Sequence, residues 1–210
     1  MKLLVIIFLI SVKVVCFGQD AVVSVSKMNF VCVCIDNQLE IAIPNIKSNK
    51  IKVSIIEGEG DLKEIGIGKY ILHPNLPGYL VLNIQSDSIV STKKLIVKKI
   101  PNPTPLLKGH MGGLISLDDI KDVTSLSCHV NNFDYKIDCK ITSYNVVFKK
   151  GGKRSNTIEY KVENNVFDKN IKSFISMLQY GDEIAFNKIN ARCPCDTEDR
   201  FIGFMRFVIQ

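Results

Sequence analysis

The cysteines are the residues of this sequence with the widest range of chemistry. Seven occur among 210 residues, and one of them, Cys16, lies in the apolar N-terminal stretch. Thiolates can bond each other, bind a metal ion or act as nucleophiles. Structural zinc sites usually separate paired cysteines by two to four residues and redox motifs use Cys-x-x-Cys, whereas this chain has Cys-x-Cys. The remaining six are Cys32, Cys34, Cys128, Cys139, Cys193 and Cys195.

An even number of cysteines in an exported chain favours disulfides, with free thiols and a metal or redox role as alternatives. Alternate residues of a strand face the same side, so Cys32 and Cys34 are not expected to bond each other. Cys193 and Cys195 flank Pro194 and could close a small ring or each bond to another strand. Six cysteines allow 15 pairings, and the sequence leaves the choice open.

Other residues capable of catalysis do not form a recognisable motif. His129 follows Cys128, but neighbours on a strand point to opposite faces, which disfavours a nucleophile–base pair. His73 precedes a proline in an expected turn, and His110 lies in the loop Gly109–Gly113, which lacks the Gly-Lys-Ser/Thr ending of a phosphate-binding loop. We therefore predict no catalytic, cofactor-binding or metal-ligating residues and no cofactor. An enzyme site assembled by folding is the remaining alternative.

The charged residues form one basic cluster. The chain has 27 basic and 21 acidic residues, a net charge of +6, and its lysines are otherwise too scattered to indicate nucleic-acid binding. The cluster surrounds Gly151 and Gly152, the expected tip of a hairpin. It either decorates that tip or contacts an acidic partner or lipid headgroups. This candidate partner-contact patch consists of Lys149, Lys150, Lys153 and Arg154.

The segment Met1–Gly18 has the pattern of a secretory signal peptide. Its apolar run, Leu3–Val12, is shorter than the roughly 20 residues of a membrane span. The alternatives are lipidation at Cys16 and a buried N-terminal strand. Removal of Lys2 and Lys13 with the leader lowers the net charge from +6 to +4. The mature chain is therefore expected to be exported and periplasmic, without a transmembrane segment.

The first half of the mature chain has the pattern of short strands separated by turns. Apolar and polar residues partly alternate, Gly, Pro and Asn separate the runs, and no helical periodicity competes. This pattern predicts an Ig-like β-sandwich. The expected strands are Ala21–Ile35, Glu40–Ile43, Lys50–Ile56, Ile65–Leu72, Tyr79–Ile84 and Ser91–Ile100.

The second half has a mixed pattern that follows a break in the chain. Three prolines within Pro101–Pro105 exclude a helix and mark the expected domain boundary. Ser116 can cap a short helix, and Asp168–Tyr180 has apolar residues at helical spacing before Gly181. The expected strands are Phe133–Lys149, Thr157–Val162, Glu183–Ile189 and Phe201–Ile209.

Several stretches resemble, in order, the C-terminal periplasmic region of the GldM family, called PorM in some species. This family belongs to the gliding-motility and type IX secretion machinery of Bacteroidetes. The order and spacing of these motifs along the chain carry the resemblance. The matching stretches are Ser26–Asn29, Asp36–Pro44, Val97–Pro103, Gly109–Ser116, Asn132–Tyr135, Ser143–Val146 and Gly181–Ile189.

The chain also departs from the family pattern. Gln38 stands where the family usually has Pro, and Cys193–Cys195 stands where it tends to have a Gly-rich loop. The family pattern places a transmembrane helix, a long helical domain and another β-domain before this region, and here the leader stands in their place. The resemblance therefore implies a stand-alone exported form with an assembly or binding role, and no coupling to an inner-membrane motor.

Together these patterns predict a mainly β protein with one helix in the second half and two tandem domains. The predicted segments are a signal peptide (1–18), a β-sandwich domain resembling the GldM third domain (19–100), a Pro/Gly-rich linker (101–112) and an α+β sandwich-like domain (113–210). We predict a non-enzymatic protein-binding or scaffolding module with protein partners in the cell envelope, a homodimer implied by the resemblance, and no nucleic-acid partner. The alternative is an exported cysteine-containing protein with a disulfide, thiol or metal-binding role.

Overall fold

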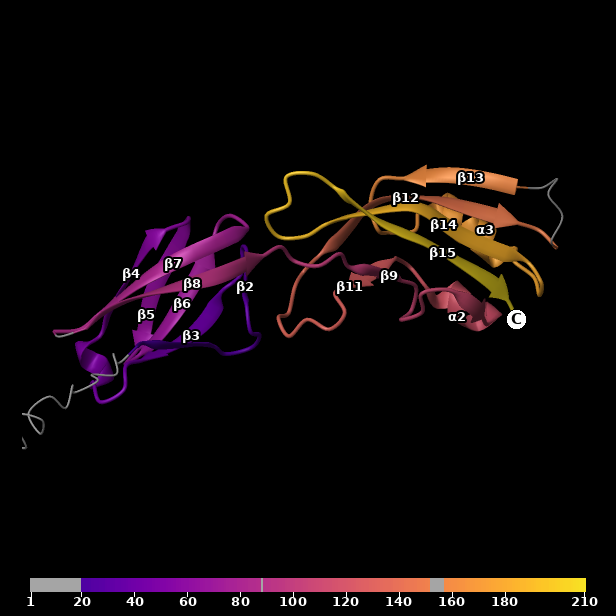
Figure 1. The fold of residues 1–210 in the computed structure, drawn as a ribbon. Coiled ribbons are helices and arrows are strands. Elements are labelled where there is room, and N and C mark those ends of the chain that lie inside the picture. Colours follow the sequence, from indigo (N-terminus) through magenta and orange to yellow (C-terminus); the bar gives the residue numbers. More distant parts are fainter. Residues whose placement is uncertain (1–19, 88, 152–156) are drawn as a thin grey trace, which may run out of the picture.

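The computed structural model describes residues 20–87, 89–151 and 157–210. These residues form two tandem β-rich domains, connected between the end of one strand at Lys98 and the start of the next at Thr104 (Figure 1). The fold class predicted from the sequence, mainly β with two tandem domains, is confirmed. The predicted leader, Met1–Gly18 with Cys16, lies outside the described residues. Among the residues described, no helix has the length and apolar character needed to cross a membrane.

The first domain is a sandwich of two four-stranded sheets. Neighbouring strands are antiparallel throughout, except that β2 and β8 are parallel. The first sheet contains, in spatial order, β1 (Val22–Val25), β3 (Asn37–Ala42), β6 (Lys69–Pro74) and β5 (Gly60–Gly66). The second contains β2 (Val31–Cys32), β8 (Val90–Lys98), β7 (Gly78–Gln85) and β4 (Lys52–Glu57). A 3-10 helix, η1 (Ser48–Lys50), lies between β3 and β4.

Alternation along the strands produces the core of this domain. On β7, Leu80, Leu82 and Ile84 are fully buried, and on β3, Leu39 and Ile41 are buried between exposed neighbours. Successive side chains of a strand point to opposite faces, so these residues converge between the two sheets. Each such buried side chain contributes about 1.5–3 kcal/mol of hydrophobic free energy.

Two of the predicted strands are divided in the structure. Ile65–Leu72 is interrupted by a turn at Gly68, where φ is +70° and an added Cβ would lie 3.0 Å from a backbone oxygen. Only glycine adopts that conformation readily, so the segment forms the hairpin of β5 and β6. Ala21–Ile35 is divided as well, because β1 pairs in one sheet and β2 in the other.

The second domain packs helices on one face of a five-stranded sheet. The sheet contains β10 (Gly113–Ile115), β15 (Arg200–Ile209), β14 (Glu183–Arg192), β12 (Lys140–Lys149) and β13 (Thr157–Val162), with only β10 and β15 parallel. A smaller antiparallel sheet pairs β9 (Thr104–Leu106) with β11 (Ser127–His129). The core includes Phe186 and Phe207 and lies between the large sheet and helices α2 (Leu117–Asp122) and α3 (Lys169–Ser176).

Both helices begin at the predicted capping residues. Ser116 Oγ accepts the backbone N–H of Asp119, and Asp168 Oδ1 accepts that of Ile171 at 2.8 Å. The predicted helix Asp168–Tyr180 is shorter in the structure, because α3 ends at Ser176. The carboxylate of Asp182 accepts the backbone N–H of Gln179 at 2.9 Å, which holds the following residues in a separate turn.

Two segments near the start of the second domain differ from the sequence prediction. Only Lys140–Lys149 of the predicted strand Phe133–Lys149 is a strand, because the preceding residues run to the domain junction, where Tyr135 is buried. β9 forms within the predicted linker, and Pro105 pairs with Cys128 in the small sheet. Proline is tolerated there because an edge position does not require its missing N–H.

Candidate functional site at the domain junction

A disulfide bond links the two domains. Cys34 follows β2 in the first domain, and Cys195 lies in the turn between β14 and β15 in the second. Their Cα atoms are 6.0 Å apart, although 161 residues separate them in the sequence. Both residues have a φ near +60°, so each lies in a tight turn rather than in a strand. The bond therefore ties a turn of one domain to a turn of the other.

A second disulfide lies beside the first, within the second domain. Cys139, just before β12, is bonded to Cys193, just after β14. The two cysteines around Pro194 therefore bond different partners, and the small ring considered from the sequence does not form. Cys32 and Cys34 do not bond each other, in agreement with the prediction.

Asn37 is the centre of a buried hydrogen-bond network at the junction. Its Oδ1 accepts the backbone N–H of Cys32 at 2.8 Å and the hydroxyl of Tyr135 at 3.0 Å. Its Nδ2 donates to the carbonyl oxygens of Cys32, Ile35 and Leu72 at 2.8 to 3.2 Å. Only Tyr135 belongs to the second domain, so one fully buried side chain connects both domains. Such a network specifies one geometry, because displacement leaves buried polar groups without partners.

An apolar cluster with members from both domains surrounds this network. The ring of Phe133, which packs on this cluster, lies 5.5 Å from the ring of Tyr135. The cluster includes Cys193 and Cys139 of the second disulfide and shields the Asn37 hydrogen bonds from water, which strengthens those hydrogen bonds. Its buried members are Cys32, Ile100, Val130 and Cys193, and the partly buried residues packed on them are Phe30, Ile35, Phe133, Ile137 and Cys139.

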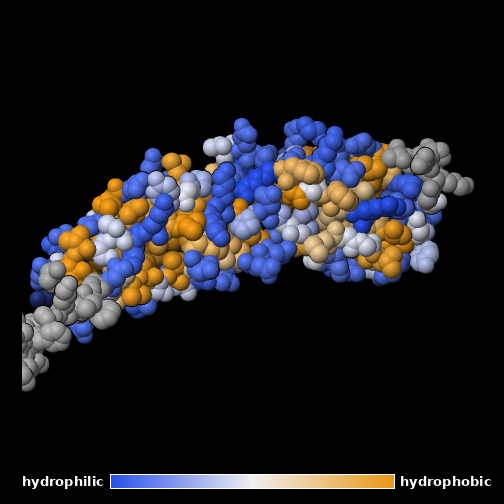
Figure 2. All heavy atoms as spheres, in the orientation of Figure 1, coloured by the Kyte–Doolittle hydropathy of each residue, from blue (hydrophilic) through white to orange (hydrophobic). Residues whose placement is uncertain are grey.

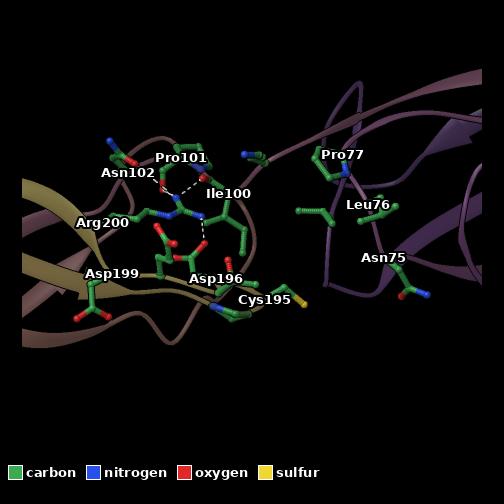
Figure 3. Close-up of a pocket in the computed structure, with 15 residues that line it drawn as sticks. Asn75, Leu76, Pro77, Ile100, Pro101, Asn102, Cys195, Asp196, Asp199 and Arg200 are labelled. Atoms are coloured by element: carbon green, nitrogen blue, oxygen red, sulfur yellow. Dashed lines mark hydrogen bonds and ion pairs between the residues drawn. The ribbon is translucent and has the colours of Figure 1, made fainter.

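Arg200, at the start of β15, holds the segment that connects the domains. Its guanidinium donates to the carbonyl oxygen of Ile100 at 2.7 Å and pairs with the Asp196 carboxylate at 2.5 Å (Figure 3). Asp196 in turn accepts the backbone N–H of Cys193 at 2.8 Å. The guanidinium, which is mostly buried, thus joins the connecting segment to the turn that carries Cys195.

A cleft of about 710 Å³ opens beside this arginine. Figure 3 shows the Arg200 cluster on one side and Asn75, Leu76 and Pro77, from the loop between β6 and β7, on the other. The Arg200 cation is already neutralised by Asp196 and its carbonyl contacts. The cleft therefore lies between the domains, and its mostly buried ion pair, Arg200 with Asp196, holds the junction together.

Two family models match the chain. The GldM third domain matches residues 20–98, and the GldM C-terminal domain matches residues 101–199. The chain belongs to the GldM family. This membership confirms the family resemblance described from the sequence motifs, and the two matches follow each other along the chain as the two domains do.

No curated protein matches this GldM-family chain. Among solved structures, domains 4 and 5 of the S-layer protein SbsC are 11% identical, with a TM-score of 0.35, and the match covers 90% of this chain and 97% of that one. The D0–D1 domain of intimin is 12% identical, with a TM-score of 0.29 and coverages of 90% and 97%. The four N-terminal Ig domains of Dscam1 isoform 8.4 are 8% identical, with a TM-score of 0.28 and coverages of 92% and 52%.

The free thiols of this GldM-family chain are poorly suited to catalysis or metal binding. Among the described residues, Cys32 and Cys128 are the cysteines without a disulfide. Burial raises the pKa of both thiols above the ordinary value, which keeps them protonated and unreactive at neutral pH. The Cys128 thiol donates to the carbonyl oxygen of Cys139 at 3.3 Å.

The predicted basic patch is only partly described. Lys153 and Arg154 lie outside the described residues, and Lys150 is exposed. Lys149 lies 3.4 Å from the Glu183 carboxylate, which also pairs with Arg206 at 2.7 Å. These cations, Arg206 first, lower the pKa of the Glu183 carboxyl below its ordinary value. Lys149 is thus partly neutralised within its own sheet.

The histidines are not brought together by the fold. His73 lies in β6, not in the predicted turn, and its Nδ1 is 2.8 Å from Asp36 Oδ1. His129 lies in β11 and His110 in the loop after β9, both in the second domain. The Cys128–His129 dipeptide pairs with β9 through its backbone. These positions do not assemble a common site.

Two exposed sheet faces were not singled out by the sequence prediction. The outer face of the sheet β2-β8-β7-β4 carries Tyr79 and Ile96, and the Ile96 side chain is 61% exposed. The face of the five-stranded sheet opposite the helices carries Leu114 and Phe204, which is 72% exposed. Figure 2 shows hydrophobic residues exposed among hydrophilic ones over both domains. The available signal was an apolar residue, such as Ile96, at a position that alternation assigns to the polar face.

Proposed function

We propose that this chain is a non-enzymatic periplasmic scaffold that binds protein partners in the cell envelope, as the distal domains of the gliding-motility and type IX secretion component do. Membership of the GldM family supports a module of that machinery. The proposal extends this to the binding role itself, to the periplasmic location and to self-association as a homodimer.

The observation that carries the proposal is the construction of the junction. The disulfide Cys34–Cys195, the buried Asn37 network and the Arg200 contacts all connect the two family domains at one place. Tandem domains joined by a small interface normally move relative to each other. A covalent and hydrogen-bonded junction instead presents the surfaces of both domains at a fixed separation, which favours a scaffold over an independent pair of domains.

Exposed apolar side chains on sheet faces supply candidate contact surfaces. Phe204 and Leu114 lie on the face of the five-stranded sheet that the helices do not cover. Large aromatic side chains are the groups that most often dominate protein interfaces. The same surface is our candidate for self-association.

In-cell photo-cross-linking tests the proposal. A photoreactive amino acid in place of Phe204 is expected to cross-link to a small set of envelope proteins, including components of the gliding or secretion machinery, and to a second copy of the chain. The matched control carries the probe at Lys47, an exposed residue before η1. A purified chain that is a strict monomer by light scattering, and that cross-links to no envelope protein in cells, contradicts the proposal.

A further inference from the structure

Strand β8 has an open edge along most of its length. It pairs with β7 from Val90 to Val97, whereas on its other side β2 pairs only with Val97 and Lys98. Among the described residues, the stretch from Val90 to Ile96 therefore has no neighbouring strand on that side (Figure 1). An unpaired strand edge presents backbone N–H and C=O groups that can pair with another extended chain.

The side chains on the outer face of β8 alternate in a regular row. Thr92, Lys94, Ile96 and Lys98 are all exposed and share this face, because they are two residues apart. On the opposite side of the strand, the carboxylate of Asp20 accepts hydrogen bonds from Ser91 and Lys93. The exposed row is thus the side from which a partner can be recognised.

The two lysines of the row are cations without an acidic partner. Lys94 Nζ lies 3.8 Å from the ring centroid of Tyr79, and Lys98 Nζ lies 4.2 Å from that of Phe30. Within the described residues neither has a carboxylate within ion-pair distance, whereas Lys50, Lys69 and Lys93 of the same domain each have one. The aromatic rings hold the two ammonium groups over the sheet while leaving their charge available to a ligand.

Lysines at a sheet edge also determine which partner is excluded. A second β8 edge would bring lysine against lysine, and like charges directly opposite each other destabilise a strand pair. A strand with carboxylates on alternate residues would instead place them on the outer face, beside Lys94 within the open stretch. Lys98 lies two residues beyond that stretch, where β2 pairs, and adds positive charge at that end of the row.

We propose that β8 accepts an extended segment of a partner protein, in which acidic residues alternate with apolar or Thr residues, as an added strand of the sheet. Backbone hydrogen bonds to the open edge would supply affinity, and the lysines together with Ile96 would supply selectivity. This inference rests on the proposed binding function and names the chemistry of the partner.

Peptide titration of the intact chain tests the inference. The probe is an eight-residue capped peptide in which Glu alternates with Val, and its comparison peptides are a block-ordered isomer and a Lys-for-Glu analogue. We expect the alternating peptide alone to bind and to slow hydrogen exchange of the backbone amides of Val90–Ile96. We expect Lys94→Glu/Lys98→Glu to weaken binding about tenfold or more, because opposed like charges penalise an interface strongly.

The matched control is Lys47→Glu/Lys63→Glu, which changes the net charge equally at exposed positions away from β8. Equal binding by both double variants, or protection confined to other strands, overturns the inference. Stronger binding to vesicles of anionic phospholipid than to the peptide, lost in the same Lys94/Lys98 variant, also overturns it by assigning the row to lipid. If envelope cross-links at Phe204 persist while the peptide fails to bind, the proposed function stands and this inference alone falls.

Discussion

Tyr144 illustrates how a single buried polar atom can limit the stability of the second domain. The residue is 1% exposed and packs edge-on against Phe167 and Phe186, but its hydroxyl oxygen has no hydrogen-bond partner among the described residues. A buried polar group without a partner costs about 1–3 kcal/mol. Burial, and then the charge of Asp168, raise the pKa of the phenol above its ordinary value.

We predict that Tyr144→Phe raises the free energy of unfolding by about 1 kcal/mol, because it removes the unsatisfied hydroxyl and keeps the ring. The difference is expected to grow with alkaline pH. The folded phenol stays protonated while the unfolded one ionises near its ordinary pKa of about 10, so the native chain loses stability as the pH rises through that value. Urea unfolding at pH 7 and pH 10.5 measures both effects. A less stable variant would show that the hydroxyl has a bound partner.

At the scale of elements, the sequence predicts a helix or strand boundary correctly where a single residue determines it. The caps at Ser116 and Asp168 were predicted from the sequence because their hydroxyl and carboxylate are the groups that satisfy free N–H groups at a helix start. β13 was predicted at its observed bounds, Thr157–Val162, because it is a short run without a competing pattern. Strand-pairing partners could not be predicted, because pairing depends on residues far away in the sequence.

The junction was beyond sequence prediction for the same reason. Cys34 and Cys195 are separated by 161 residues, and no local pattern distinguishes their pairing from the other 14. Asn37 lies in a β-strand, where alternation indicates an inward position but not the partner Tyr135 in another domain. The stretch Asp36–Pro44 belongs to the family motifs recognised from the sequence. Only the fold shows that its Asn37 bonds to Tyr135 of the second domain.

The capping prediction can be tested directly on α3. Asp168→Ala removes the acceptor for the Ile171 N–H and is expected to lower the free energy of unfolding by about 1 kcal/mol. Lys169→Ala, one residue later and exposed, is the matched control and should change stability by less than about 0.5 kcal/mol. Denaturant midpoints measure both. Equal losses in the two variants would argue against a capping role.

On the scale of the whole molecule, covalent and non-covalent links at the junction are redundant. The disulfide Cys34–Cys195 constrains the unfolded chain over a long loop, which stabilises the folded chain by about 5 kcal/mol. The Asn37 hydrogen bonds and the surrounding apolar cluster act instead on the relative position of the folded domains. The two kinds of link should therefore respond differently to mutation.

We predict that Cys34→Ser/Cys195→Ser lowers the free energy of unfolding by about 5 kcal/mol but leaves the domains tumbling as one body, because the Asn37 network remains. Adding Asn37→Ala removes the hydrogen bond to Tyr135 and leaves buried groups unpaired, so the two domains should then acquire separate rotational correlation times. Nitrogen-15 relaxation measures the correlation time of each domain, and Cys128→Ser, at a cysteine outside both disulfides, is the control.

Separate tumbling already in the double serine variant would mean that the disulfide alone holds the junction. The scaffold would then depend on an oxidising compartment, since reduction would release the second domain without unfolding either one.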